Sequence, residues 1–207
     1  RQEHGFHARP WTAPDASPRA VFEAELAPCR LSRYSCRLES LPEKPRPTLG
    51  EKAGAFTVET PDLVVSVNAR TGLMDVYRAG GYDLLGPDAF APLVIKDNAD
   101  PWGMKVRSFR AVEGHFVPAT PEQTALFCGL REGGLAPVRV IEDGPVRAVI
   151  EAVLAYGDSR LAIRYKVPKR GAEVEVEARV FWAERDRMLK LSLPSKLRRP
   201  RFMGQVA

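Results

Sequence analysis

Two carboxylates and one indole ring stand close together near the middle of the sequence. Asp97 and Asp100 enclose Asn98 and Ala99, and Trp102 follows two positions later. Two carboxylates held about 5 to 5.5 Å apart can cleave a glycosidic bond with retention of configuration, and an indole face can stack on a sugar ring. The same run is also good turn chemistry, because Asx side chains bond nearby backbone amides. We expect a turn for the carboxylates and a core position for Trp102, with sugar contact as the alternative.

A second polar pair follows a predicted strand. Glu184 and Arg185 come after Trp182, which has the same parity as Val176 and Val180. Alternation of this kind predicts that Trp182 lies on the apolar face of a strand. Glu184 and Arg185 are suited to bonding sugar hydroxyls or an adjoining domain, but a structural ion pair at the strand end is the expected role. The candidate carbohydrate-binding residues are therefore Asp97, Asp100, Trp102, Glu184 and Arg185.

No residue of this sequence is assigned a catalytic or metal-binding role. A Gly-x-Ser-x-Gly elbow, a phosphate loop and a dinucleotide fingerprint are all missing. His4 and His7 have a His-x-x-His spacing without a Cys or acidic partner in a ligand pattern. Cys128, next to Phe127, is interpreted as a small core residue.

Composition narrows the class of partners and the compartment. The net charge of +5, from 31 Lys and Arg against 26 Asp and Glu, is too mixed along the chain for a nucleic-acid footprint. Three cysteines make an odd count without a disulfide framework, which favours a reducing cytoplasm. No run approaches the ~18 apolar residues of a membrane span. The chain starts at Arg1 rather than Met, so we interpret it as a fragment of a longer protein.

The sequence divides into three parts. Residues 1–19, rich in proline and small polar residues, are interpreted as a linker. Residues 20–48 hold a short β segment, expected to pair as a hairpin that turns near Pro28, and then a proline-rich linker. Residues 49–207 read as short runs of Val, Leu, Phe and Tyr between Gly, Pro, Asn and Asp, which predicts an all-β domain.

Two hairpins and one long strand are predicted in this domain. The first hairpin spans 63–77 and the second 160–182, with a turn at 168–171. A symmetric turn in the second would place Lys166 opposite Glu173 and Arg164 opposite Glu175, and would set Arg160 against Arg179. Residues 146–154 match a helical stripe slightly better than a strand, yet their β-branched content and neighbours favour a long strand.

Several motifs resemble the C-terminal region of glycoside hydrolase family 38, the α-mannosidase-like enzymes. They are Glu59-Thr60-Pro61 with Asn68-Ala69-Arg70-Thr71-Gly72-Leu73; Asp97-Asn98-Ala99-Asp100-Pro101-Trp102-Gly103; and Asp143-Gly144-Pro145-Val146-Arg147 through Tyr156-Gly157-Asp158-Ser159 to Phe181-Trp182-Ala183-Glu184-Arg185 and Met188-Leu189-Lys190-Leu191. The third is the most specific, because separate segments keep their order. Many members carry a second Trp and an Asp where this chain reads Gly103-Met104-Lys105.

The resemblance implies a fold and a setting. The fold is an antiparallel β supersandwich of the galactose mutarotase kind. The setting is a chain whose N-terminal catalytic and helical domains are the partners of this region and hydrolyse terminal α-mannosides with a zinc ion. The cofactor belongs to that catalytic domain, and none is expected in this segment. The implied function is a non-catalytic domain that supports catalysis and contacts a mannose-containing glycan, without nucleic-acid or membrane partners. The alternatives are a stand-alone carbohydrate-binding module and a structural domain that forms homo-oligomers.

Overall fold

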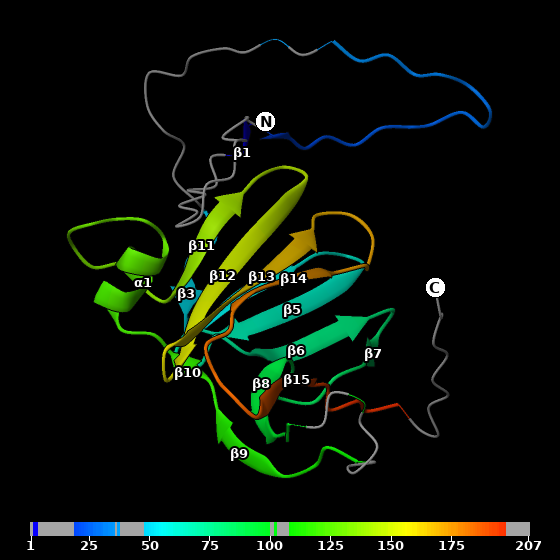
Figure 1. The fold of residues 1–207 in the computed structure, drawn as a ribbon. Helices are drawn as coiled ribbons and strands as arrows, with labels where there is room; N and C mark the ends of the chain where they lie inside the picture. The colour runs from blue at the N-terminus through cyan, green and yellow to red at the C-terminus, as the bar shows by residue number, and fades with distance from the viewer. Residues whose placement is uncertain are drawn as a thin grey trace.

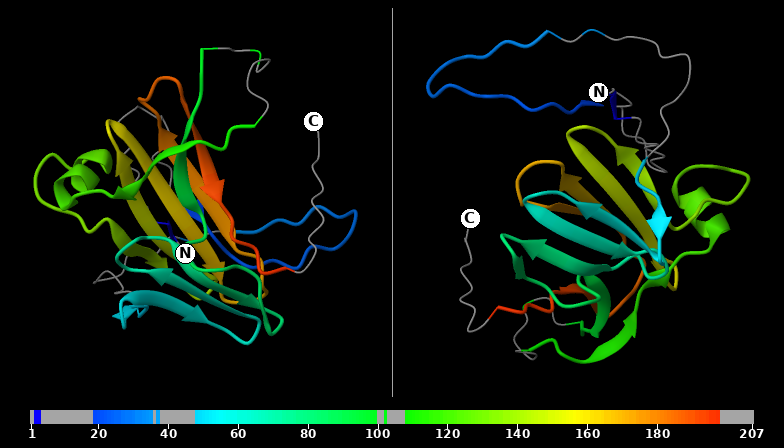
Figure 2. Two further views of the ribbon diagram at one scale, coloured as in Figure 1. Left: turned by 90° about the horizontal axis from the view of Figure 1, so that it is seen from below. Right: turned by 180° about the vertical axis from the view of Figure 1, so that it is seen from behind.

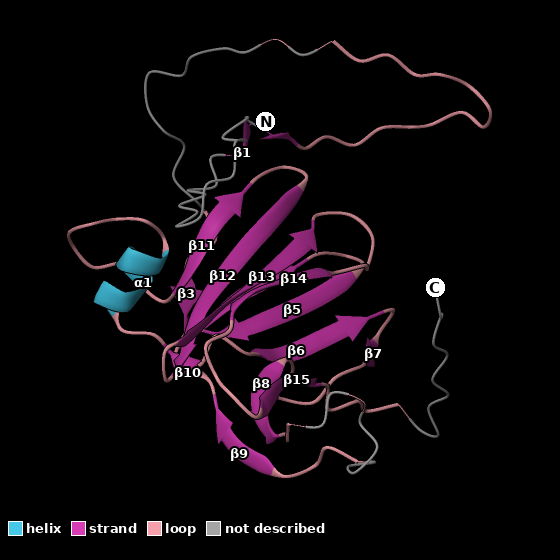
Figure 3. Ribbon diagram, viewed as in Figure 1, coloured by secondary structure: helices cyan, strands magenta, loops and turns pink. Residues whose placement is uncertain are grey.

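The computed structural model describes residues 2–3, 19–35, 37, 48–99, 102 and 108–197. In this part of the chain the secondary structure is antiparallel β-strand apart from one short helix (Figures 1 and 3). The strands form a sandwich, so the expected all-β antiparallel class is confirmed. The proline-rich runs before residue 19 and at 41–47 lie outside the described residues, as do His4, His7 and Asp100.

The first sheet contains five strands in chain order, each joined to the next by a tight connection. They are β3 (Glu51–Lys52), β4 (Ala55–Glu59), β5 (Leu63–Asn68), β6 (Met74–Ala79) and β7 (Tyr82–Asp83). The predicted 63–77 hairpin is confirmed as β5 and β6. Its turn is held by Asn68, whose Oδ1 accepts bonds from the N–H groups of Arg70 at 2.9 Å and Thr71 at 3.1 Å.

The second sheet is built around one central strand, β12 (Arg147–Tyr156). On one side of it run β10 (Val117–Pro118) and β11 (Val138–Asp143), and on the other β13 (Ser159–Pro168) followed by β14 (Glu175–Phe181). A third sheet has the order β15 (Arg187–Ser192), β8 (Ala91–Lys96), β9 (Val112–His115). Near the N-terminus, β1 (Gln2–Glu3) pairs with β2 (Arg19–Ala20).

The main core lies between the first two sheets. Figure 2 shows the strands of the first sheet, in cyan, crossing those of the second, in yellow. Leu63, Val65 and Val67 of β5 are buried while the residues between them are partly exposed, which is the period-2 pattern of a strand with one buried face. Tyr165 on β13 is wholly buried in the same cluster, and Trp182 packs against this cluster. The predicted apolar position of Trp182 is therefore confirmed.

Strand β12 is buried on both faces, which explains why its sequence also matched a helix. Ile150 and Leu154 face the main core, whereas Val153 and Ala155 face a smaller cluster on the other side of the sheet. That cluster includes Cys128, which follows the helix α1 (Pro121–Phe127). A strand buried on both faces has a nearly continuous apolar run, so periodicity cannot separate it from a buried helix. The predicted long strand is confirmed, and so is Cys128 as a core residue.

The register of the 160–182 hairpin differs from the prediction. Lys166 pairs with Glu175, and Arg164 with Glu177, so the predicted partners are wrong by two residues. The turn is longer than four residues because β14 begins only at Glu175. A shift of two keeps every side chain on its expected face, and it sets Arg160 opposite Phe181 instead of Arg179. The observed register thus avoids a like-charge pair.

Residues 20–35 form an open arm instead of a paired hairpin. The chain turns at Pro28 and Cys29, as expected, and the Cys29 backbone has a φ of 54°. No strand ladder joins the two limbs within the described residues. The predicted pairing is wrong there, because most side chains of both limbs are exposed and no apolar face is buried to fix a register.

A buried carboxylate fastens the segment before β3 to the second sheet. Asp143 Oδ2 accepts bonds from the Thr48 N–H at 2.7 Å, the Thr48 hydroxyl at 2.6 Å and the Leu49 N–H at 2.8 Å. Its Oδ1 lies 3.0 Å from Lys169 Nζ. Desolvation by itself raises the pKa of Asp143, but these hydrogen bonds outweigh it and the net pKa lies well below the usual range. Asp143 therefore stays ionised and joins three separate segments.

We expect this attachment to weaken in acid. Because the folded-state pKa of Asp143 is depressed, its contribution to stability is present above the unfolded pKa of about 3.9 and is lost as the pH falls toward the folded value. The stability difference between the wild type and Asp143→Asn should then be largest near neutral pH and should shrink below about pH 4. Urea unfolding across this range measures it. A difference that stays constant down to the lowest pH would contradict the assignment.

Candidate functional site

The segment that carries Asp97 lies beside the loop that carries Glu184 and Arg185, at one end of the third sheet. Arg187 of β15 pairs with Lys96 of β8, and the Asp97 N–H donates to the Asp186 carbonyl at 2.8 Å. These bonds hold the segment after β8 beside the loop 183–186 that precedes β15. Asp97 Oδ1 accepts a bond from the Asn98 N–H at 2.7 Å. The Asp97 carboxylate thus bonds the neighbouring backbone amide, and its expected role in a turn stays a prediction.

Glu184 is fixed by two neighbours at this site. Its Oε1 lies 3.1 Å from the Ser159 hydroxyl, and its Oε2 lies 3.8 Å from Arg187 Nη1. Ser159 is wholly buried and also accepts a bond from the Ala183 N–H at 2.9 Å. Arg187 binds Glu113 of β9 through its Nε at 2.9 Å. Glu184 therefore has the structural ion pair predicted for it, although the partner is Arg187 and not its neighbour Arg185.

The turn between β12 and β13 packs tightly against Glu184. Gly157 has a φ of +50°, and a Cβ at this position would come within 2.8 Å of Glu184 Oε1. Only glycine satisfies both the left-handed backbone and this close approach. Tyr156 to Ser159 and Phe181 to Arg185 are two segments of the motif that resembles family 38. They are thus in direct contact.

Trp102 and Arg185 are the exposed members of the candidate set. The Trp102 side chain is 84% exposed, so the predicted core position is wrong. It follows β8 in the sequence, six positions after the strand ends at Lys96. Arg185 is exposed as well, and its carbonyl accepts a bond from Arg187 Nη1 at 3.3 Å. Both side chains are accessible to a ligand.

An aromatic cluster lies beneath this site. The ring of Phe116 lies 6.4 Å from that of Trp182 in a stacked arrangement, and 5.8 Å from that of Tyr156. A Cβ on Gly114 would come within 2.4 Å of the Tyr156 ring, so β9 approaches the second sheet closely here. These contacts place the turn 157–159 and the loop 183–186 on a rigid base.

Sequence reasoning missed a buried ion cluster on the outer face of the second sheet. The Glu151 side chain is 4% exposed and bonds Arg164 Nε at 2.7 Å as well as Arg139 Nη2. Cys128 Sγ lies 3.1 Å from Arg139 Nη2. Burial raises the pKa of the Cys128 thiol despite this arginine. A lone Glu inside the apolar run 148–155 was the signal, because a charge in such a strand requires partners.

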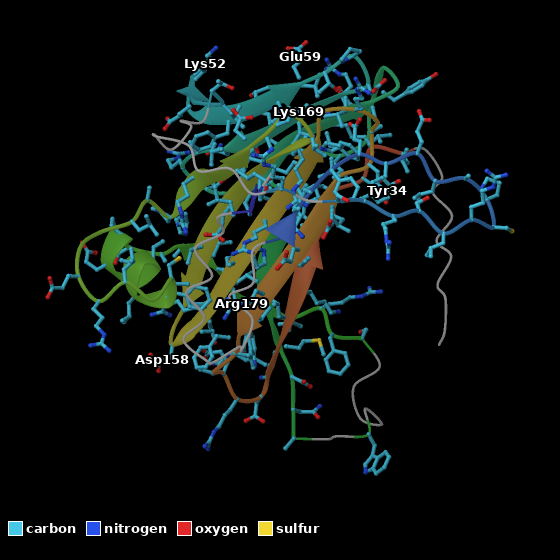
Figure 4. The ribbon with its side chains drawn as sticks, turned by 90° about the horizontal axis from the view of Figure 1, so that it is seen from above. Tyr34, Lys52, Glu59, Asp158, Lys169 and Arg179 are labelled. Carbon is cyan, nitrogen blue, oxygen red and sulfur yellow. The ribbon has the colours of Figure 1, made fainter. Side chains whose placement is uncertain are left out.

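A polar groove on the first sheet was also not predicted. Its volume is about 260 Å³, and Figure 4 labels three of its charged residues, Lys52 and Glu59 at the sheet and Lys169 on the turn that follows β13. Thr48, Leu49, Gly50, Thr57 and Val58 complete the lining. Lys169 is already engaged with Asp143. The groove therefore lies directly beside the attachment that Asp143 makes.

The described part of the chain has neither a metal-ligand cluster nor a membrane-spanning helix. No group of three or more His, Cys, Asp and Glu side chains among them is arranged to hold a metal ion, so zinc has no ligand set in this part of the chain. In the same part of the chain, no helix has the length and apolarity needed to cross a membrane.

Comparison with known proteins identifies the class of the second half of the chain. Residues 119–205 match the family model described as the glycosyl hydrolases family 38 C-terminal domain. No curated protein matches the chain. The resemblance predicted from sequence is confirmed over the matched residues, which include both the 157–159 turn and the 183–186 loop. Residues 119–205 thus resemble the C-terminal domain of family 38 glycosyl hydrolases, and they lie in an antiparallel β sandwich.

Proposed function

We propose that this chain is the non-catalytic β domain of an α-mannosidase-like enzyme, that it supports the catalytic domain, and that it contacts a mannose-containing glycan. The observation that carries the proposal is the family match over 119–205, which includes the 157–159 turn and the 183–186 loop of the site at the end of the third sheet. The catalytic and helical domains of the parent are the proposed partners. The zinc ion of the family would be held by the catalytic domain.

The chemistry of the carboxylates supports a role without catalysis. A general acid near neutral pH needs a raised pKa, as carboxyl groups acquire in apolar surroundings. The pKa of Asp143 is shifted the other way, to keep it ionised. Glu151 lies between two arginines, and Glu184 is bound to Ser159 and Arg187. These carboxylates hold segments of the fold together, and proton transfer to a leaving group would break that function.

Exposure of Trp102 supports the sugar contact and also favours the second candidate function, a stand-alone carbohydrate-binding module. An indole that is 84% exposed, five positions after Asp97 in the sequence, offers a flat face to a sugar ring. The two candidates differ in whether the chain binds sugar by itself. Two free cysteines among the described residues, Cys29 and Cys128, agree with the cytoplasmic location that we propose.

The first experiment is calorimetric titration of this chain with mannose and a mannobiose, alongside an assay on an aryl α-mannoside. We expect no hydrolysis. Binding would support the sugar contact, and binding that matches an intact enzyme's would favour the stand-alone module. Hydrolysis by the purified chain would overturn the proposal that the domain is non-catalytic.

Replacing Trp102 by alanine is expected to weaken mannobiose binding about three- to tenfold, since one aromatic contact contributes about 0.5–1.5 kcal/mol. Thermal stability should not change, because the side chain is exposed. The matched control is Tyr82→Ala on β7, an aromatic that is 75% exposed and lies outside the site. Calorimetry and thermal melts measure both effects. Equal loss of affinity in the two variants, or a destabilised Trp102→Ala, would contradict the assigned role.

A further inference from the structure

The polar groove on the first sheet runs along an uncovered part of the β4 edge. The ladder between β3 and β4 holds two residue pairs and ends where Glu51 pairs with Phe56. Beyond Phe56, the described part of the chain places no strand on this side of β4. The groove, with a volume of about 260 Å³, lies there, between residues 57–59 and residues 48–50. A bare strand edge of this kind is a template for another extended segment.

Backbone hydrogen bonds to β5 fix which residues of β4 face the groove. At the two ends of β4, the Ala69 N–H donates to the Gly54 carbonyl at 2.8 Å, and the Thr60 N–H donates to the Leu63 carbonyl at 2.9 Å. The register between these two bonds has no shift. Bonded pairs recur at every second residue of an antiparallel ladder, so the even-numbered residues of β4 bond β5.

The odd-numbered residues Thr57 and Glu59 therefore direct their N–H and C=O groups into the groove. They would pair with residues 48–50 if β3 continued in the same register. Asp143 Oδ2 instead accepts bonds from two N–H groups of that segment, at 2.7 and 2.8 Å. The attachment to Asp143 thus holds residues 48–50 away from β4 and leaves two backbone positions of β4 without a strand partner there.

The lining of the groove favours an extended peptide over other small ligands. Among the described residues no aromatic ring lines it, so a sugar ring has no face on which to stack. Lys169 is already paired with Asp143 at 3.0 Å, which leaves Lys52 and Glu59 as two opposite charges and makes a poor anion site. The backbone groups that face the groove are two residues apart, which is the repeat of a β-strand.

We propose that this groove binds the C-terminal tail of a partner protein, as a short strand antiparallel to β4 in the place left by residues 48–50. Binding by strand addition takes its affinity from main-chain hydrogen bonds and its specificity from side chains. The added strand must end beside Thr57, because β3 occupies the next ladder position at Glu51. The inference does not depend on the proposed sugar contact.

The charges of the groove set the direction and the chemistry of the tail. In the antiparallel direction the first bound residue lies opposite Glu59, the third lies opposite Thr57, and the terminal carboxylate points toward Lys52. Figure 4 labels Lys52 and Glu59, and both are exposed. A parallel tail would bring its carboxylate to Glu59 instead, and like charges repel. The preferred tail therefore has a basic residue two positions before its last residue.

Titration with the acetylated tripeptide Lys-Ala-Val, followed by NMR, tests the added strand. We expect the amide signals of Thr57 and Glu59 to shift at millimolar peptide. N-methylation of the third residue removes the N–H that faces the Thr57 carbonyl and should weaken binding about three- to tenfold. N-methylation of the second residue, whose N–H faces away from β4, is the matched control and should leave the affinity unchanged.

Three results of this titration would overturn the proposal. The first is the absence of any shift at Thr57 and Glu59, and the second is an equal loss of affinity from both N-methylated peptides. The third is a shift of the same two amides by mannose but not by the peptide, which would make the groove a sugar site.

Charge changes test the direction of the tail. Glu59→Lys should weaken binding of Lys-Ala-Val several-fold and strengthen binding of Glu-Ala-Val. Glu173→Lys, an equal charge reversal in the exposed turn before β14, is the control and should change neither affinity. Amidation of the peptide's carboxyl end should weaken binding to the parent chain and have little effect on Lys52→Gln. An amidated peptide that binds the parent chain as well as the free acid would contradict the proposed tail.

Discussion

Replacing Glu151 by alanine is expected to lower the free energy of unfolding by about 3–5 kcal/mol, the usual cost of removing one partner from a buried ion pair. The side chain is 4% exposed and holds Arg139 and Arg164, whose side chains are 17% and 14% exposed. Without the carboxylate, two guanidinium groups remain close together with little access to water. Urea denaturation of the purified chain measures the loss.

The control for this variant lies on the same face of the same sheet. Glu175→Ala also removes a carboxylate from an ion pair, with Lys166 at 2.7 Å, but its side chain is 64% exposed. It should cost no more than about 1 kcal/mol. Replacing Glu151 by leucine together with both arginines by methionine should recover most of the loss, since an apolar cluster of similar volume is often as stable as a buried ion cluster. Equal losses in the Glu151 and Glu175 variants would show that Glu151 is solvated.

Replacing Gly72 by alanine is expected to cost about 2–5 kcal/mol, from a left-handed backbone and from overpacking together. The residue has a φ of +72°, and an added Cβ would lie 2.6 Å from the Cβ of Ala152 and 3.2 Å from Cγ2 of Val138. Its carbonyl also accepts the Tyr165 hydroxyl at 3.0 Å. The turn after β5 thus touches the central strand of the opposite sheet, and any side chain there separates the two layers. Thermal unfolding measures the effect.

Gly54→Ala separates the two contributions. Gly54 has a similar φ of +78°, but nothing lies within 4 Å of an added Cβ. This variant should show only the backbone cost of about 1–2 kcal/mol. If both variants lose the same stability, the contact between Gly72 and Ala152 is not tight, and the packing argument is wrong.

Local patterns were sufficient to predict most of the sheet elements. Alternation in β5 and β13 identified their buried faces, and the Asn68 turn identified the first hairpin. Register was harder, because a shift of two residues in the β13 and β14 hairpin preserves every face and exchanges one set of charge partners for another. The short helix α1 was missed, although Thr120 and Gln123 form a capping box there, since seven residues hold too little periodic signal.

The candidate site was predicted only in part. Glu184 has the ion-pair role expected of it, and the Asp97 carboxylate bonds a backbone amide, whereas Trp102 is exposed instead of buried. Single-residue burial depends on which strands surround a position, and no local pattern carries that information for a tryptophan in a loop. The contacts of Glu184 with Ser159 and Arg187 depend on segments that meet only in the folded sheet.

Strand β8 sets a limit on when this sandwich can form as the chain is synthesised. One of its edges pairs with β9, which follows soon after, but the other pairs with β15 near residue 190. Ser195 then bridges back to Leu85, and the Gly86 N–H donates to the Pro194 carbonyl. Until those late residues leave the ribosome, β8 has a bare edge and part of the core has no cover. A nascent chain that stalls before residue 187 would therefore expose the unpaired edge of β8. Chaperones that bind extended apolar segments would be expected to bind the chain at this stage.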